Sequence, residues 1–139
     1  MITLLLMNKI KATILNIQNI DNLNIVEFDF NSIKLKMMSL ELKEGITIGK
    51  KVILTVKPSH ISLAKNLEGN LTISNKIDAT IEEIIDGELL SLYKIATHDT
   101  ILESIFTYSC SKEMSLKKGE EITLLIKASD LSILEILDD

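Results

Sequence analysis

Arginine and tryptophan are absent from this chain of 139 residues, and all fifteen basic residues are lysine. Proteins that bind nucleic acid usually carry a basic surface and use arginine to contact phosphate and guanine. Here the formal net charge is -5, and aromatic residues make up only 4% of the chain. We therefore expect no nucleic-acid partner, because the residues for phosphate contacts and base stacking are scarce.

Cysteine is also scarce, since Cys110 is the single thiol and cannot form a disulfide within the chain. This fits a reducing compartment. The apolar start, residues 1–7, has no preceding positive charge and is too short for a signal-peptide core or a membrane span. The sequence contains no zinc or phosphate-loop pattern and no paired nucleophile and base. We expect a soluble cytoplasmic protein with no membrane partner, no bound metal and no enzymatic activity.

What the sequence does contain is an internal repeat. Residues 8–14, NKIKATI, return as residues 75–81, NKIDATI, at a spacing of 67 (8 to 75). Residues 56–62, VKPSHIS, return as residues 126–132, IKASDLS, at a spacing of 70 (56 to 126), which Gly49 and Gly119 share. Three shared features in the same order indicate two copies of one unit. We assign the first repeat to residues 1–66 and the second to residues 67–139, with a longer loop in the second at the hairpin around His98.

The periodicity of both repeats is typical of strands. Apolar and polar residues alternate or apolar residues cluster at residues 9–14, 25–30 and 32–36, and again at 89–95 and 101–106. Residues 109–116 predict a short helix with Ser109 or Ser111 as N-cap, and residues 39–44 predict a weaker counterpart. Residues 131–137 are apolar and predict a further strand. The fold expected is mainly all-β: two tandem small OB-like β-barrels, each with one short helix, joined by a polar linker at residues 64–70.

Over essentially its whole length the sequence resembles the molybdenum-pterin-binding (Mop, or molbindin) domain of the TOBE superfamily. That family's first strand has the pattern S-x-R-N-x-x-x-G, and its last strand ends in I-K-A-S. Residues 72–79, TISNKIDA, align with the first pattern without a gap, and residues 126–129, IKAS, match the second. The family also has a threonine, and a serine three residues later, ahead of a short helix and a glycine. Thr107, Cys110 and Gly119 occupy those positions.

The first repeat departs further from the family pattern than the second. The arginine position is changed in both repeats, and only the second keeps a hydroxyl at the first serine position, as Thr72. Met37 falls at the threonine position of the first repeat by its spacing from Gly49. Pro58 removes a backbone N–H that Ala128 supplies in the second repeat. We therefore expect the second repeat to be the better ligand donor.

The resemblance implies a bound tetrahedral oxyanion, molybdate or tungstate, held where first-strand residues of one domain face the Lys-x-Ser turn of another domain or subunit. These dianions carry no proton at neutral pH, so a cage of backbone N–H groups, hydroxyls and lysine suits them. The donors implied in this chain are Thr72, Ser74 and Asn75 in the first strand, Thr107 and Cys110 before the helix, Lys57 and Ser59 in one turn, and Lys127, Ala128 and Ser129 in the other.

Several alternatives stay open at this point. The Cys110 thiol could contact the anion or fill an apolar gap. His60 is expected in a surface turn, because Asp130 takes its place in the second repeat. The resemblance implies a homo-oligomer, a trimer or alternatively a dimer, that stores or buffers molybdate or tungstate. The alternatives are a ligand-sensing domain acting with a transcription factor or a molybdate transporter, and a generic OB-like module for nucleic acid or protein.

Overall fold

The computed structural model describes residues 7–137, so our expectation for residues 1–6 of the apolar start lies outside the described part. The strands of the first repeat are β1 (Asn8–Ile20), β2 (Leu23–Phe30), β3 (Ile33–Ser39), β4 (Lys51–Val56) and β5 (Ser62–Ala64). Those of the second are β6 (Asn75–Asp86), β7 (Leu90–Thr97), β8 (Thr100–Thr107), β9 (Glu121–Ile126) and β10 (Ser132–Ile136). Short 3-10 turns, η1 (Pro58–His60) and η2 (Ala128–Asp130), follow β4 and β9, and α1 (Tyr108–Met114) follows β8. The predicted strands, including the one at the C-terminal end, are confirmed.

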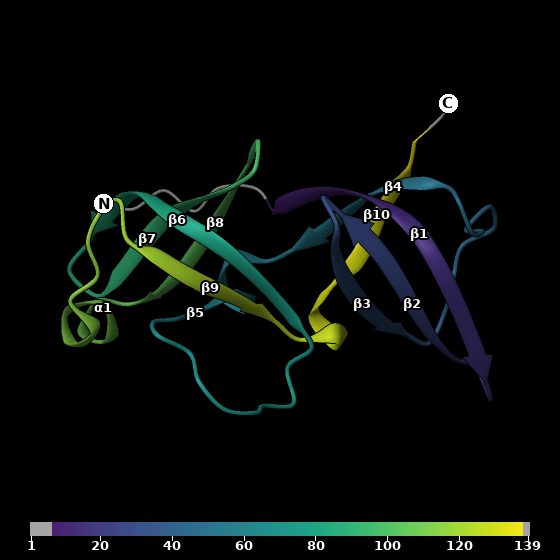
Figure 1. Cartoon of the computed structure of the whole chain (residues 1–139), viewed down its shortest axis with the longest axis horizontal. Coiled ribbons are helices and arrows are strands. Elements are labelled where there is room, and N and C mark those ends of the chain that lie inside the picture. The colour runs from purple at the N-terminus through teal and green to yellow at the C-terminus, as the bar shows by residue number, and fades with distance from the viewer. Residues whose placement is uncertain (1–6, 138–139) are drawn as a thin grey trace.

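The strands form two antiparallel five-stranded sheets, in the orders β10-β4-β1-β2-β3 and β5-β9-β6-β7-β8. Each sheet takes one edge strand from the other repeat, because β5 pairs with β9 and β10 pairs with β4. In Figure 1 the yellow β10 accordingly lies beside the blue and purple strands of the first sheet. The division of the chain into a first repeat of residues 1–66 and a second repeat of residues 67–139 stays a proposal. Neither sheet is completed by residues of its own repeat.

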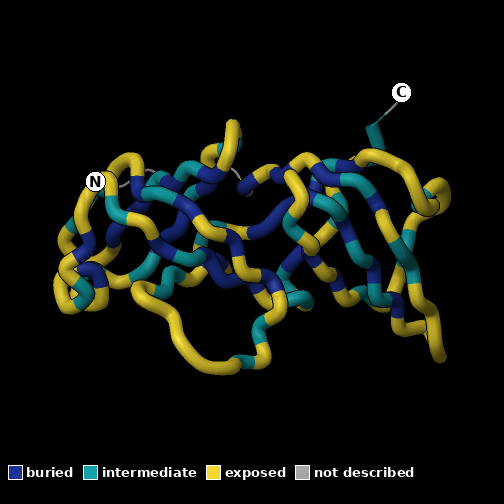
Figure 2. The backbone as a smooth tube through the Cα atoms, in the orientation of Figure 1, coloured by how far each residue is buried: buried dark blue, intermediate teal, exposed yellow. Residues whose placement is uncertain are grey.

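The alternation of side chains explains where the core lies. The first seven residues of β1 and of β6 alternate between inner positions that are buried and outer positions that are exposed or half-buried. Figure 2 shows buried residues running along the strands and exposed residues along most of the connections, including the long segment between β5 and β6. The core is aliphatic, with Phe28, Phe30 and Tyr93 as its largest members. Burying each such side chain contributes roughly 1.5–3 kcal/mol, so the inner faces supply most of the stability.

Two asparagines fasten each repeat to the other. The Asn75 side chain accepts a hydrogen bond from the Lys36 N–H at 2.7 Å and donates to the Lys36 carbonyl at 2.8 Å. Asn8 makes the same two bonds with the backbone of Glu103, at 2.7 and 2.8 Å. Lys36 and Glu103 lie on β3 and β8, which are edge strands of the two sheets. The asparagines therefore pair backbone groups that face outward from a sheet edge.

Within the described residues, only the second repeat forms an α-helix. The N-cap of α1 is Thr107 rather than Ser109 or Ser111, and its Oγ1 accepts from the Cys110 N–H at 3.2 Å. Below the helix, the Tyr93 hydroxyl and Ser111 Oγ lie 2.5 Å apart. The expectation of one helix in each repeat is wrong at residues 39–44, where Ser39 ends β3 and turns follow.

The position of the extra residues explains this difference. The β2–β3 and β7–β8 hairpins both have two-residue turns, so the expected longer loop around His98 is wrong. The spacing between the repeats changes instead from 67 to 70 in the connection that contains α1. The first repeat also has Val26 where the second has Tyr93, so it lacks both the length and the polar anchor of the helix. Among residues 7–137, no helix has the length and apolar character needed to cross a membrane.

Candidate anion-binding site

The two Lys-x-Ser turns have nearly the same backbone. Lys57 (φ -68°, ψ 142°) and Lys127 (φ -69°, ψ 144°) are both extended and lead from β4 and β9 into the short 3-10 turns. Both lysines are exposed, as are Ser59 and Ser129. Each turn is followed by a buried residue, Ile61 or Leu131, which fixes the chain to the core. The sequence repeat thus produces two copies of one local geometry with its polar groups facing solvent.

The turns differ in the backbone donors that they offer. In the described part of the chain, the N–H groups of Ala128 and Ser129 donate no backbone hydrogen bond. Pro58 has no N–H, so Ser59 supplies the single N–H at the equivalent two positions of the first turn. The second turn therefore presents two N–H groups, a hydroxyl and an ammonium to an anion, and the first presents one N–H fewer.

Each turn packs against the opposite repeat. The turn η1 lies against β8, and η2 lies against β3. The buried hydroxyl of Ser104 on β8 donates to the Ile61 carbonyl at 2.5 Å and holds the first turn in place. The two turns also contact each other, since His60 Nδ1 and Asp130 Oδ1 are 3.6 Å apart. Sequence reasoning found the shared position of His60 and Asp130 but not their pairing, and it missed Ser104, whose signal was a polar residue at a core position.

A small cavity of about 160 Å³ brings the first turn to the helix of the second repeat. Ser59, Phe106, Cys110 and Met114 are among its lining residues, and no carboxylate lines it. Cys110 is exposed, so the alternative that it is a buried apolar side chain is wrong. Thr107 is exposed one turn before Cys110 and already caps α1. This cavity combines the turn that has fewer N–H groups with the Cys110 thiol of the second repeat.

A larger cavity of about 560 Å³ lies beside the second turn. Ser129 lines it together with Met38, Ser39, Glu41 and Lys43 of the first repeat. No helix fills this side, because the first repeat lacks a counterpart of α1. The second turn, with more N–H groups, therefore faces a cavity to which the first repeat adds the Ser39 hydroxyl, the Lys43 ammonium and the Glu41 carboxylate.

The first-strand residues occupy different places. Thr72 and Ser74 are exposed and precede β6, whereas Asn75 is fully buried and its side chain is bonded to the Lys36 backbone. Asn75 lies opposite Ile126 in the sheet, so Ser74 is at the same sheet end from which Lys127 continues. The Asn75 side chain thus has a structural role, and the hydroxyls of Thr72 and Ser74 are accessible. Within residues 7–137, no three His, Cys, Asp or Glu side chains are placed to hold a metal ion.

Comparisons with known proteins bear on the fold. No profile of a protein family matches the sequence, and a search of curated proteins gives no match. Among solved structures, the chain is similar to ModG, described as a cytoplasmic molybdate-binding protein, in a crystal form with molybdate bound. The TM-score is 0.84 at 23% sequence identity, over 91% of this chain and 94% of that one. The likeness shows that this chain has the mainly β, Mop-like fold that the sequence resemblance predicted.

Proposed function

We propose that this chain binds a small tetrahedral oxyanion, molybdate or tungstate, at its Lys-x-Ser turns. The observation that carries the proposal is that both turns are exposed, share one backbone geometry and lie beside a cavity formed with the other repeat. The fold shared with a protein described as molybdate-binding supports it. The donors would be Lys127, Ala128 and Ser129 with Ser74 and Thr72, and Lys57 and Ser59 with Thr107 and Cys110.

The donor set suits a fully deprotonated dianion. Backbone N–H groups, hydroxyls and lysine ammonium groups can all donate to its four oxygens. Phosphate retains a proton at neutral pH and needs a hydrogen-bond acceptor for it. The small cavity at the first turn is lined by no carboxylate that could accept this proton. Recognition by local dipoles and two lysines is compatible with a net charge of -5, because the donors act at close range.

Calorimetric titration with molybdate, tungstate, sulfate and phosphate tests the proposal. The expected result is binding of molybdate and tungstate, weaker binding of sulfate, which is also a fully deprotonated dianion but is smaller, and little or no heat from phosphate. A folded sample that gives no heat with any of the four anions would overturn it. Equal binding of all four would show a general anion site and would contradict the proposed selectivity.

The physiological role proposed is storage or buffering of the oxyanion in the cytoplasm by a binding protein that is not an enzyme. The similar structure ModG is described as a cytoplasmic protein, which supports this location. A homo-oligomer, a trimer or alternatively a dimer, belongs to the same proposal and rests on the family resemblance. We keep the expectation of no nucleic-acid and no membrane partner. Light scattering with and without molybdate measures the oligomeric state.

A further inference from the structure

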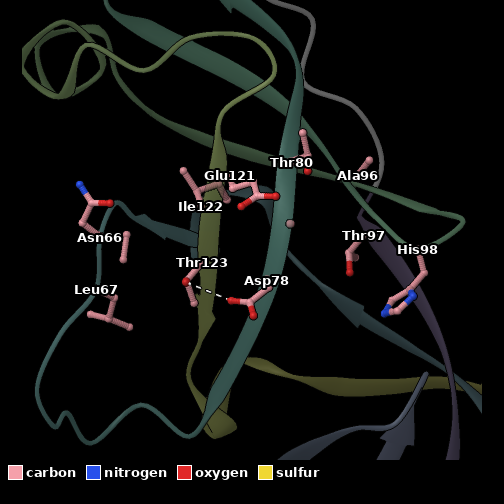
Figure 3. A pocket seen from close by; sticks show the side chains of 12 residues that line it. Asn66, Leu67, Asp78, Thr80, Ala96, Thr97, His98, Glu121, Ile122 and Thr123 are labelled. Atoms are coloured by element: carbon pink, nitrogen blue, oxygen red, sulfur yellow. Dashed lines mark hydrogen bonds between the residues drawn. The ribbon is translucent and has the colours of Figure 1, made fainter.

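A cavity of about 570 Å³ lies over β6 and β9, away from both Lys-x-Ser turns. Figure 3 shows Asp78 and Glu121 on adjacent strands in its lining, with Asp78 accepting from the Thr123 hydroxyl at 3.3 Å. Among the described residues that line it, none is a lysine. Two carboxylates repel an anion at close range, so this cavity is not a further oxyanion site.

The two cavities beside the Lys-x-Ser turns occupy equivalent places in the two sheets. The edges of the first sheet are β3 and β10, and those of the second are β8 and β5. In the cavity of about 560 Å³, Ser129 and residues 131–133 take the places that Ser59 and residues 61–63 have in the cavity of about 160 Å³, at a spacing of 70 (59 to 129). Residues of both β3 and β10 line the larger cavity, which we call the open seam.

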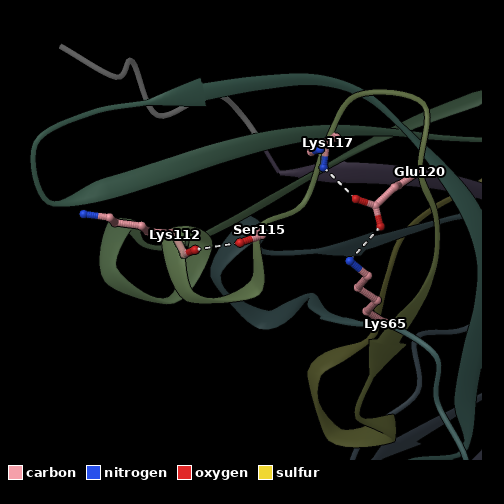
Figure 4. A network of polar contacts seen from close by, with 5 residues as sticks. All are labelled: Lys65, Lys112, Ser115, Lys117 and Glu120. Atoms are coloured by element: carbon pink, nitrogen blue, oxygen red, sulfur yellow. Dashed lines mark hydrogen bonds and ion pairs between the residues drawn. The ribbon is translucent and has the colours of Figure 1, made fainter.

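The helix α1 narrows the equivalent place in the second sheet. Cys110 and Met114 of the helix line the smaller cavity. The connection after the helix is tied to the end of β5, because the Glu120 carboxylate accepts from the Lys117 N–H at 2.9 Å and lies 3.2 Å from Lys65 Nζ. Figure 4 shows these contacts near the end of the helix. The helix and its connection therefore leave only the small cavity between the edges β8 and β5.

In the described residues of the first repeat, no helix narrows the open seam. The connection at residues 40–50 has turns and irregular backbone in place of α1, and its Leu42 and Ile46 are only half-buried. Lys50 stands where the second repeat has Glu120 (50 to 120), and an ammonium group cannot accept the hydrogen bond that ties the connection there. The larger volume of the open seam follows from these two differences.

The lining of the open seam is mainly aliphatic. Met37 and Leu131 are each 2% exposed, whereas Met38 and Leu40 are 42% and 73% exposed, so the apolar wall runs from the core to the surface. None of the described lining residues is aromatic. Unbranched methionine side chains adapt to a flexible ligand, whereas planar rings pack well against aromatic side chains. The wall therefore suits an alkyl chain better than a planar ring.

The polar end of the open seam is the second Lys-x-Ser turn. Ser129 brings a hydroxyl and, in the described part of the chain, an N–H that donates no backbone hydrogen bond. On the wall formed by the first repeat, Lys43 and Glu41 carry opposite charges, and the Ser39 hydroxyl already donates to the Glu41 carbonyl at 2.7 Å. The donors of the turn thus lie beside an apolar wall with no net charge. Such a cavity can hold an oxyanionic group at one end and an alkyl chain along the rest.

We propose that the open seam binds a single-chain amphiphile with an oxyanionic head group, of the fatty-acid carboxylate class. The carboxylate accepts from the N–H and hydroxyl of Ser129, and the alkyl chain lies against Met38, Leu40 and Leu42. A bare oxyanion at this turn leaves the apolar wall in contact with water, whereas an alkyl chain removes that wall from water. The head group rests on the proposed function, because it uses donors of the second turn, so molybdate and the amphiphile compete there.

Titration calorimetry with hexanoate, octanoate and decanoate, each below its critical micelle concentration, tests the inference. The dissociation constant should fall by up to about fourfold for each added CH₂ that is buried. Decyltrimethylammonium, which has a similar chain but a cationic head, should not bind at the same concentrations. No binding of decanoate, an affinity independent of chain length, or equal binding of the cationic amphiphile would overturn the inference.

A charged side chain in the apolar wall locates the alkyl chain. Met38→Glu should weaken decanoate binding by at least about tenfold, because the chain would then lie against a carboxylate. The matched control is Leu89→Glu, which makes the same change of net charge at a side chain that is 81% exposed in the β6–β7 connection and should bind like the wild type. Circular dichroism first establishes that both variants are folded. A folded Met38→Glu that binds decanoate as tightly as Leu89→Glu would overturn the inference.

Titration with both ligands separates this inference from the proposed function. Decanoate that is displaced by molybdate supports both. Molybdate binding without decanoate binding would overturn only the amphiphile, and decanoate binding without heat from molybdate would overturn only the oxyanion function. Binding of both without competition would contradict a shared position at Ser129. Co-sedimentation with phosphatidylglycerol vesicles, without binding of free decanoate, would assign the seam to a membrane surface and would contradict a free amphiphile.

Discussion

Single residues decide how the two Lys-x-Ser turns differ. In the described part of the chain, the N–H groups of Ala128 and Ser129 in the second turn donate no backbone hydrogen bond, whereas Pro58 removes one of the equivalent groups from the first turn. A hydrogen bond to a charged group contributes about 1.5–3 kcal/mol, so one additional N–H is enough to make the second turn the tighter site.

The double variant K127A/S129A should therefore weaken molybdate binding more than K57A/S59A. We expect a loss of about 10- to 100-fold in Kd for the second turn, and a smaller loss for the first. Titration calorimetry of both variants checks the order, with Lys118→Ala as a control because this exposed lysine lies in the connection before β9. Equal losses in the two double variants would contradict the inequality of the turns.

A second prediction at this scale concerns the two asparagines between the repeats. Asn75→Ala would leave the Lys36 N–H and carbonyl without their present partners at 2.7 and 2.8 Å. Each unpaired buried group costs about 1–3 kcal/mol, so the free energy of unfolding should fall by about 2–4 kcal/mol. Asn8→Ala should cost a similar amount, since Asn8 makes the same bonds to Glu103. Urea unfolding monitored by circular dichroism measures both, and a loss below about 0.5 kcal/mol would mean that water replaces the side chain.

At the scale of elements, α1 depends on the polar group beneath it. Burial, as the largest cause, raises the pKa of the Tyr93 hydroxyl, and nearby Asp86 adds to this, while the hydrogen bond with Ser111 lowers it. In the unfolded chain a tyrosine loses its proton near pH 10. Above that pH the unfolded state releases a proton that the folded state keeps, so the folded state becomes less stable as pH rises toward the raised pKa.

The free energy of unfolding should consequently fall above about pH 10, by up to about 1.4 kcal/mol for each pH unit from this group. Tyr93→Phe should remove this part of the alkaline slope, although it loses about 1 kcal/mol at pH 7 with the hydrogen bond to Ser111. Denaturant unfolding at a series of pH values compares the two proteins. An unchanged slope in Tyr93→Phe would show that another group causes the alkaline loss.

The elements also show what sequence reasoning could and could not reach. The strands were predictable because alternation of buried and exposed residues is local, as in residues 9–14 of β1. The absence of a helix at residues 39–44 was not predictable from local pattern. The helix α1 of the second repeat is held by the contact between Tyr93 and Ser111, and the first repeat has Val26 at the position of Tyr93. The Lys-x-Ser turns were found from the repeat. The elements of the opposite repeat that these turns contact could not be found from the sequence. The strand β5 offers the same backbone groups to β4 as to β9, which are equivalent strands, so the pattern does not tell which of the two it pairs with.

At the scale of the whole molecule, the exchange of β5 and β10 makes the two repeats interdependent. Each repeat on its own would leave an edge of β4 or β9 without its outer strand, and Asn8 and Asn75 without their partners on β8 and β3. A unit of this size buries only about 60% of its unfolded surface, so it has little stability to lose. We expect residues 1–66 expressed alone to be unfolded or aggregated.

The same exchange should hold the molecule together after the chain is cut. A protease site introduced into the exposed segment at residues 66–70 breaks the connection between β5 and β6 without removing any strand. Both fragments should then elute together in size-exclusion chromatography and separate only under denaturing conditions. Two sheets that were each complete within one repeat would share few backbone bonds and would separate more readily. Fragments that elute apart under native conditions would therefore contradict the strand exchange. A complex that survives cutting would show that the strand exchange joins the repeats without the linker.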